Sequence, residues 1–583
     1  MRKWVFLALF SLAGGCSRND ESPVPSAPRS PGPAVEPTAS SPFPCTFVDV
    51  SESSGIRFQH VTGGYGEKFL PETMGSGGAF LDYDGDGILD VFLVNSCFWP
   101  GHEPPGQPQP RCALFRGKGN CTFEDVTDAT GAGISLYGMG CSVADYDGDG
   151  DDDLYVTGVG KNVLLRNDGG KFSDVTESAR AGVGLWKDPD GNLKPDWSTP
   201  SAWADIDLDG DLDLLVGNYI EWTTATEIFT TIDGVTKAFT TPDRYHGLPC
   251  RLHLNQGDGT FVDATAAAGL EEYKGKTLGI GFWDFDGNGF LDMVLANDTR
   301  PNFLFMNRGG ARFEETGLAA GIAYDETGRA RAGMGIDIAD YANDGVPGVV
   351  VANFSDEPIS LYRWQKDGTF SSEAGRAGVA LPTYNTLAFG IRFEDFDLDG
   401  NLDLFIVNGH IEPAVNMVFQ NQTYLQSPQL FRGRGDGTFE DVSDGVGAGF
   451  RHPRVSRGLA LGDMDGDGDL DALVTTRAGT PVLFRNDRSP GQHYHYLRLR
   501  LHGKGKNTKA LGTTLRLTAG GVTQTRLART GCSYLSESES IITFGLGKAT
   551  RVEKLHVRWP TGSEKVVPVE GVDRTIDVWE AVP

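Results

Sequence analysis

The chain is short of three things: cysteine, positive charge and long apolar segments. Only 8 of its 583 residues are Cys, and 51 Lys and Arg stand against 79 Asp and Glu, for a formal net charge of −28. A surface this acidic repels the phosphate backbone of nucleic acids, and we therefore expect no nucleic-acid partner. The apolar run Trp4–Leu12 has about nine residues, which is too short for a permanent membrane-spanning helix.

Recognisable catalytic motifs are also missing. The sequence has no nucleophile elbow, no phosphate-binding loop and no zinc-protease helix. We therefore expect no enzyme activity and no catalytic residue. One disulfide is expected among Cys97, Cys112 and Cys121, with its pairing left open, whereas Cys141 is as well explained as a buried free thiol.

Glycine and aspartate are plentiful, and they recur together. The 78 Gly and 39% hydrophobic residues are typical of a turn-rich, strand-rich protein. A nine-residue pattern, Asp-x-Asp-x-Asp/Asn-Gly-x-x-Asp, begins at Asp82, Asp145, Asp205, Asp284, Asp395 and Asp463, with a worn copy at Asp340. The copies start 55 to 79 residues apart, which is the period of a propeller blade with variable loops.

The flanks of these loops repeat as well. An apolar strand lies on either side, then a Gly hairpin such as 257–261 and a short strand such as 125–127, which predicts four strands per unit. We predict an all-β fold with a seven-bladed β-propeller over residues 43–489 and a small β domain over 490–583. The last blade lacks its outer strand, and we predict that residues 46–50 supply it.

Each complete loop offers oxygen ligands at alternating positions. Several carboxylates, one backbone carbonyl and water make the hard, six- or seven-fold oxygen set that Ca²⁺ prefers, and Mg²⁺ fits less well. In each set of five given next, the fourth residue binds the ion through its backbone carbonyl and the others through their side chains. The predicted ligands are Asp82, Asp84, Asp86, Ile88 and Asp90; Asp145, Asp147, Asp149, Asp151 and Asp153; Asp205, Asp207, Asp209, Asp211 and Asp213; Asp284, Asp286, Asn288, Phe290 and Asp292; Asp395, Asp397, Asp399, Asn401 and Asp403; and Asp463, Asp465, Asp467, Asp469 and Asp471.

The worn loop departs from this pattern. Ala342 replaces the second ligand and Gly348 the last, which leaves Asp340 and Asp344. We expect this site to be empty or weak, so the chain is predicted to hold about six Ca²⁺ ions.

Several stretches resemble known families. The loops and hairpins resemble FG-GAP/VCBS repeats, as in integrin α-subunit propellers. The stretches 74–82, 332–337, 407–413 and 457–463, with 507–513, 544–547 and 557–562 in the tail, resemble the cartilage acidic protein family and its bacterial relatives. That resemblance implies an integrin-α-like propeller joined to a C-terminal ASPIC/UnbV domain, and an extracellular role.

The first residues have the pattern of an export signal. Two basic residues, the apolar run and small residues before Cys16 resemble a bacterial lipoprotein signal over residues 1–16, and residues 17–42 form a Ser/Pro-rich tether. The resemblance implies acylation of Cys16 and a place at the outer membrane or cell surface. A plain signal peptide is the alternative.

The last ninety residues differ in charge. From residue 491 onward there are 14 Lys and Arg against 8 Asp and Glu. Either this basic domain docks on the acidic propeller, or it offers a basic face to an acidic glycan or lipid headgroup.

Two functions are considered. The first is a calcium-binding adhesion or binding module for an extracellular protein or glycan, using the insertion 221–250 with Trp222, Phe229 and Tyr245. The alternative is an enzyme, or an accessory factor of secondary metabolism, that uses the central propeller pocket.

Overall fold

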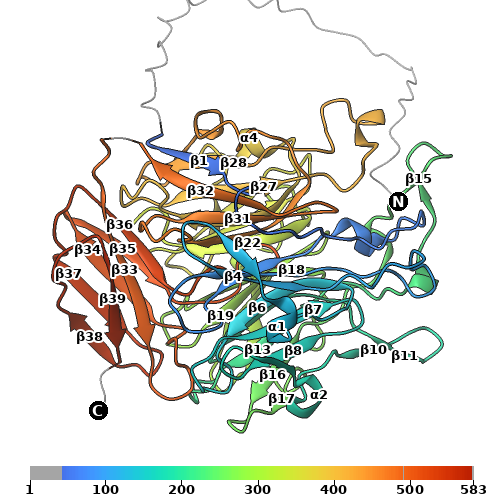
Figure 1. The fold of residues 1–583 in the computed structure, drawn as a ribbon, viewed down its shortest axis with the longest axis horizontal. Helices are drawn as coiled ribbons and strands as arrows, with labels where there is room; N and C mark the ends of the chain where they lie inside the picture. Colours follow the sequence, from blue (N-terminus) through green and yellow to red (C-terminus); the bar gives the residue numbers. More distant parts are fainter. Residues whose placement is uncertain (1–42, 490, 581–583) are drawn as a thin grey trace, which may run out of the picture. The chain divides into compact units, whose positions relative to one another are not determined.

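A computed structural model describes residues 43–489 and 491–580, and Figure 1 shows its fold. These residues belong to one compact unit. The predicted signal segment, the tether and Cys16 lie outside the described residues.

Seven four-stranded antiparallel sheets form the blades of a propeller. Blades 1 to 4 are β2 (Gly78–Leu81), β3 (Asp90–Leu93), β4 (Ala113–Gly117) and β5 (Phe123–Asp125); β6 (Gly138–Ala144), β7 (Asp153–Gly158), β8 (Val163–Asn167) and β9 (Phe172–Asp174); β12 (Ser198–Ala204), β13 (Asp213–Asn218), β16 (Arg251–Asn255) and β17 (Phe261–Asp263); and β18 (Thr277–Trp283), β19 (Asp292–Asn297), β20 (Phe303–Asn307) and β21 (Phe313–Glu315). Blades 5 and 6 are β22 (Gly333–Ala339), β23 (Gly348–Asn353), β24 (Ser360–Trp364) and β25 (Phe370–Ser372); and β26 (Ala388–Glu394), β27 (Asp403–Asn408), β28 (Gln429–Gly433) and β29 (Phe439–Asp441).

Blade 7 closes the ring with strands from both ends of the propeller. It contains β30 (Ser456–Gly462), β31 (Asp471–Thr476) and β32 (Val482–Arg488), and β1 (Cys45–Asp49) pairs antiparallel with β32, Cys45 opposite Arg488. The expectation that the N-terminal strand completes this blade is confirmed. The inner strands contact one another in sequence order and β30 contacts β2, so the ring is continuous.

The helices of the described residues are short, because most of these residues lie in the strands of the blades and in the loops that connect them. The α-helices are α1 (Thr127–Thr130), α2 (Thr176–Ala179), α3 (Gly317–Ala320) and α4 (Ala380–Thr383). The 3-10 turns are η1 (Leu70–Thr73), η2 (Thr224–Thr226), η3 (Pro242–Arg244), η4 (Val415–Met417) and η5 (Ser443–Gly445). Two hairpins extend the loops of blade 3: β10 (Leu185–Lys187) with β11 (Leu193–Pro195), and β14 (Thr230–Thr231) with β15 (Lys237–Ala238).

The C-terminal strands build two small sheets, drawn in red in Figure 1. One has the order β36 (Ile542–Gly547), β33 (His495–His502), β39 (Arg574–Trp579); the other has β35 (Val522–Leu527), β34 (Thr514–Ala519), β37 (Lys554–Arg558), β38 (Glu564–Val567). Alternating side chains such as Leu497, Leu499 and Leu501 enter their shared core, as the period-two pattern requires.

The segment 530–539, between β35 and β36, lies on the axis of the ring; we call it the plug. Its backbone bonds the inner strands of several blades: Glu537 with Gly78, Leu535 with Cys141, Cys532 with Ile280 and Ser533 with Ile336. The side chain of Tyr534 is fully buried against Phe389 of blade 6, with ring centroids 4.9 Å apart. A ten-residue segment that reaches inner strands all round the ring fills its centre.

The cysteines do not form the expected disulfide. Cys97, Cys112, Cys121 and Cys141 are all free thiols. Cys112 lies in the apolar core that includes blades 1 and 2, whereas Cys121 lies in the core that includes blades 7 and 1. The prediction was wrong because closeness in sequence does not place these side chains in the same core; for Cys141 the buried thiol is confirmed.

Candidate metal centres

All the aspartate loops lie on one face of the propeller, because each connects the inner strand of a blade to its second strand. We call this the Asp-loop face. The connections from second to third strand, including 221–250 and 409–428, and those from the fourth strand to the next blade, including 373–387, emerge at the opposite end of the strands and form the long-loop face. Within each Asp loop glycines take left-handed backbone angles, such as φ +82° at Gly87, which favour glycine.

The carboxylates of a loop converge on one point. In five complete loops three carboxylate oxygens lie within 4.8 Å of one another: Asp82, Asp84 and Asp86; Asp145, Asp147 and Asp153; Asp205, Asp207 and Asp213; Asp284, Asp286 and Asp292; and Asp395, Asp397 and Asp399. The spacing in sequence therefore brings three of the predicted carboxylates together in each of these loops, and the complete ligand sets stay a prediction.

Some carboxylate oxygens in these clusters are buried and have no hydrogen-bond partner, which indicates that the clusters can accept a cation. In all six complete loops a buried carboxylate oxygen has no hydrogen-bond partner; these oxygens belong to Asp82, Asp84, Asp147, Asp205, Asp284, Asp397, Asp465 and Asp469. In the blade 6 loop the Arg432 guanidinium lies 2.9 Å from Asp397 as an ion pair. Buried carboxylate oxygens without a partner are costly, and a hard divalent cation is the ligand that oxygen clusters of this kind accept. The residues present therefore fit a calcium ion.

The last aspartate of each loop has a second task. Asp213 accepts hydrogen bonds from the backbone N–H of Ile206 at 2.9 Å and of Asn255 at 2.9 Å, so it ties the loop to the third strand. Asp90, Asp153, Asp292, Asp403 and Asp471 make the same pair of bonds. Each oxygen keeps a lone pair for an ion, so the two roles are compatible.

Burial makes these carboxylates hard to ionise in the absence of an ion. It raises the pKa of Asp153 to about 9 and that of Asp213 to about 8, although backbone hydrogen bonds oppose the shift. It also raises the pKa of Asp469 to about 10, and repulsion from Asp467 and Asp471 adds to the effect. Nothing in the geometry tests the predicted carbonyl ligands such as Ile88 and Phe290, which stay predictions.

The worn loop of blade 5 keeps the backbone bonds of the other loops with fewer carboxylates. Both oxygens of Asp340 accept backbone hydrogen bonds, from Asp344 at 3.0 Å and Gly345 at 2.8 Å, as those of Asp145, Asp395 and Asp463 do, and Asp344 pairs with Arg363. The ring of Tyr341 fills the space that a side chain at Gly348 would need.

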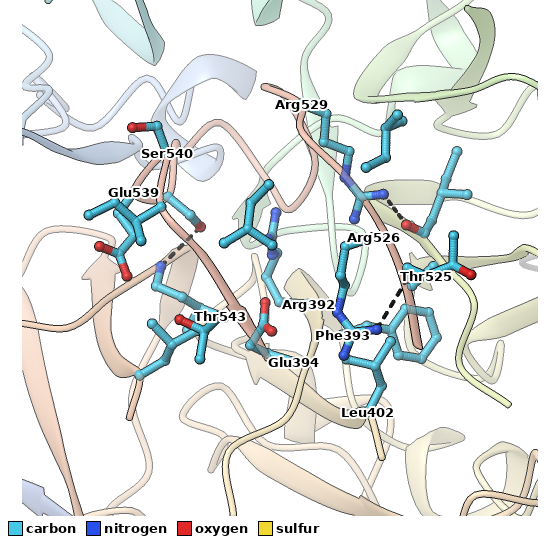
Figure 2. A pocket seen from close by; sticks show the side chains of 18 of the residues that line it. Arg392, Phe393, Glu394, Leu402, Thr525, Arg526, Arg529, Glu539, Ser540 and Thr543 are labelled. Atoms are coloured by element: carbon cyan, nitrogen blue, oxygen red, sulfur yellow. Dashed lines mark hydrogen bonds between the residues drawn. The ribbon is translucent and has the colours of Figure 1, made fainter. Parts of the chain in front are cut away.

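Arginines gather beside this blade. Figure 2 shows Arg392, Arg526 and Arg529 around a cavity of about 80 Å³ between the inner strands and the C-terminal sheets. Arg529 pairs with Asp337. Burial raises the pKa of Asp340, and the positive charge of Arg526 opposes that shift.

Four asparagines that the sequence prediction missed join the loops of neighbouring blades. The Nδ2 of Asn255 donates to Tyr146 O of the preceding loop at 2.9 Å and to Leu212 O of its own loop at 3.1 Å. Asn167, Asn307 and Asn486 bond the preceding blade in the same way. For Asn167, Asn255 and Asn307 the signal is visible in the sequence, where Asn ends the third strand just before the Gly hairpin.

The basic C-terminal sheets dock on the Asp-loop face. Arg498 lies 2.8 Å from Asp463, Lys509 pairs with Asp152, and Arg558 lies 3.6 Å from Asp284. Asp152 stands where the other complete loops carry Leu (Leu89, Leu212, Leu291, Leu402 and Leu470). The expectation that the basic domain docks on the acidic propeller is confirmed.

The insertion 221–250 does not present the aromatic surface that was expected. Trp222 and Tyr245 are 3% and 7% exposed and belong to the core around Phe69, while Phe229 is 69% exposed. Trp222 packs edge-on against Phe69 at 5.7 Å and donates through Nε1 to Glu227 at 2.7 Å. The prediction was wrong for these two residues because the insertion folds back on η1.

The fold and the loops together define a class of protein: an all-β propeller with an aspartate-rich loop in each blade and a docked C-terminal β domain. The FG-GAP-like repeat profile matches residues 82–156, 145–216, 284–351, 340–406 and 417–474, and the ASPIC and UnbV profile matches residues 503–582. The chain belongs to the FG-GAP-like repeat family. These families are not typical of enzymes.

Curated relatives extend the likeness to part of a longer protein. Cartilage acidic protein 1 is 26% identical in Homo sapiens over 319 residues, 53% of this chain and 44% of that protein, and 25% identical in Mus musculus over 318 residues. The chain thus matches less than half the length of these distant relatives. In the described residues no helix is long and apolar enough to cross a membrane.

Several solved structures are similar to this chain at low sequence identity. An Agrocybe aegerita lectin that recognises non-reducing terminal N-acetylglucosamine has 17% identity and a TM-score of 0.33, covering 63% of this chain and 81% of its own. BBS1N in complex with ARL6DN has 11% identity and a TM-score of 0.41, covering 77% and 99%. YCF48 bound to D1 peptide has 10% identity and a TM-score of 0.37, covering 78% and 98%.

Proposed function

We propose that this chain is a calcium-binding extracellular module that binds a protein or glycan ligand. The observation that supports calcium binding is the contrast between loops. Every complete loop holds a buried carboxylate oxygen without a hydrogen-bond partner, whereas the worn loop has Ala342 at the second ligand position and holds no such carboxylate oxygen among its described residues. In this proposal the aspartates hold about six ions, which neutralise and stiffen the blades.

The ligand surface is the long-loop face. The C-terminal sheets cover part of the Asp-loop face and the plug occupies the axis, which argues against the alternative of a catalytic pocket at the centre. The long-loop face instead exposes apolar side chains, Phe229, Leu381, Met417 and Leu425, which are 52–86% accessible. Exposed apolar side chains of this kind mark interaction surfaces when they gather.

The calcium claim is tested by metal analysis and calorimetric titration of the intact chain. Five or six ions per chain, with a melting temperature that falls in EDTA and returns with Ca²⁺, support it. Fewer than about three ions would refute it.

The ligand claim is tested by glycan arrays and pull-down with the Ca²⁺-loaded chain. Leu381→Asp on the long-loop face should weaken saturable binding, and Val566→Asp, at another exposed apolar residue but on the C-terminal sheets, should not. Equal loss in both variants would move the site away from this face.

Export and anchoring through Cys16 complete the proposal. Its test is mass spectrometry of the cell-envelope protein, in which a diacylglyceryl thioether on Cys16 is expected and a Cys16→Ser variant should be released from the membrane fraction. An unmodified N-terminus beyond residue 16 would leave a plain secreted protein.

A further inference from the structure

Stretches of the C-terminal domain that carried the family resemblance sit directly on Asp loops. Asn507 donates its backbone N–H to Gly210 O of the blade 3 loop at 3.1 Å. Thr508 Oγ1 donates to Asp145 Oδ2 of the blade 2 loop at 2.7 Å. Gly547 donates its backbone N–H to Leu398 O of the blade 6 loop at 2.8 Å.

The partners of these bonds lie inside the predicted ligand sets. Gly210 stands between Asp209 and Asp211, and Leu398 stands between Asp397 and Asp399. An ion that draws those carboxylates together also fixes the carbonyl between them. The domain therefore docks on atoms whose positions depend on the ligand loop.

The fit at blade 6 is tight. Gly545 lies against the carboxylate of Asp395, leaving no room for a Cβ atom there, and its carbonyl accepts a bond from Gln524 at 2.6 Å. A loop spread by carboxylate repulsion would push into this glycine, whereas a loop drawn in by an ion would not.

The domain's bonds to ligand-loop atoms described above come from neutral donors, which affects whether docking helps or opposes cation binding. Lys509 and Lys506 also approach the loops of blades 2 and 3, but each pairs with a carboxylate that is not a predicted side-chain ligand, Asp152 and Asp211, the latter at 3.8 Å. At blades 4 and 7 the domain instead brings Arg558 and Arg498 to the first aspartate. A guanidinium lowers the affinity of a nearby cation through Coulomb repulsion, but a hydroxyl or a backbone N–H adds no net charge. Blades 2, 3 and 6 are thus where docking and ion binding can favour each other.

We propose that ion binding in the loops of blades 2, 3 and 6 and docking of the C-terminal domain with its plug stabilise each other. This inference rests on the proposed calcium binding. Coupling of this kind is reciprocal: an ion that strengthens docking is itself bound more tightly when the domain is docked. The metal loops then control how firmly the axis of the propeller is filled.

Hydrogen exchange followed by mass spectrometry on the intact chain tests the coupling. With Ca²⁺ in place of EDTA, peptides covering 507–512, 530–539 and 544–547 should exchange roughly tenfold more slowly, within the 5–150-fold range of typical coupling energies. Strands β37 and β38, which belong to the outer part of the same domain, should change less.

Variants test the reciprocal direction by calorimetric titration. Gly545→Ala should weaken one Ca²⁺ site roughly tenfold, and Gly375→Ala, which meets no neighbouring atom, should not. If Gly545→Ala fails to fold, Thr508→Ala is the milder change, with Thr518→Ala on the exposed face as its control.

The outcomes separate the two ideas. The coupling would be overturned, with calcium binding left intact, by two results together. The intact chain would bind Ca²⁺ normally with unchanged hydrogen exchange in all three peptides, and the Gly545→Ala or Thr508→Ala variant would titrate with Ca²⁺ like its control. No Ca²⁺ binding to the intact chain would overturn both.

Discussion

Replacement of Tyr534 by alanine is the sharpest test of the plug. Its side chain is fully buried, its ring packs edge-on against Phe389 at 4.9 Å, and its hydroxyl donates to Met74 O at 3.1 Å. Removing a buried aromatic ring costs about 3–5 kcal/mol, and loss of the hydrogen bond adds about 1 kcal/mol. Tyr534→Phe keeps the ring and should cost only that last contribution.

These energies convert into melting temperatures. If the described residues unfold together, an unfolding entropy of about 2.1 cal/mol/K per residue sums to roughly 1.1 kcal/mol/K, so Tyr534→Ala should lower Tm by about 4 °C and Tyr534→Phe by about 1 °C. Differential scanning calorimetry in excess Ca²⁺ measures both, with Tyr384→Ala, a 44% exposed tyrosine, as control. A Tyr534→Ala shift confined to a small separate transition, or no larger than the control, would refute the view that the plug stabilises the ring.

Three further outcomes are expected. Buried loop carboxylates have raised pKa values, such as about 9 for Asp153, so they take up protons more readily in the folded than in the unfolded protein, and the EDTA-treated protein should gain stability as pH falls from 9 towards 4. Thermal melts should show that the difference in Tm between the Ca²⁺-loaded and the EDTA-treated protein shrinks over that range. A difference in Tm that stays constant would contradict this. Asn255→Ala should cost about 2–4 kcal/mol, because two loop carbonyls lose their donor; denaturant melts check it against Gln256→Ala on the exposed hairpin, and equal stabilities would argue against inter-blade ties. Gly348→Asp should lower Tm without adding an ion, because the Tyr341 ring fills the site, and a gain of one Ca²⁺ by metal analysis would show that the loop can be restored so simply.

The blades were predictable because their physics is local and repeated. The spacing of Asp82 and its counterparts, the Gly turns and the period-two strands each report on neighbours within one blade. The inter-blade asparagines were equally visible as a repeat, but their partners lie 84 to 109 residues away for Asn167, Asn255 and Asn307, so the sequence showed the pattern without its purpose.

The plug could not be predicted. Its polar, serine-rich sequence has no apolar period, and its partners range from Gly78 to Leu461. The fold satisfies its backbone by pairing it with inner strands, and it holds Cys532, Ser533 and Leu535 at positive φ, an arrangement that persists only where the surroundings impose it. Trp222 was misjudged for a related reason, since its partner Phe69 lies on a loop about 150 residues earlier.

Blade 5 shows what the loops require of the chain. It has lost two ligands, yet it keeps four strands and its place between β18 and β26. Tyr341 fills the space of the missing aspartate, Arg363 pairs with Asp344, and Arg529 pairs with Asp337 of the inner strand. Buried carboxylates must be neutralised or hydrogen-bonded, and here guanidinium groups and backbone N–H groups meet that need. The ring therefore requires charge balance at each blade rather than the same ion in each, and at blade 5 the propeller's own Arg363 and Arg529 of the C-terminal domain supply it.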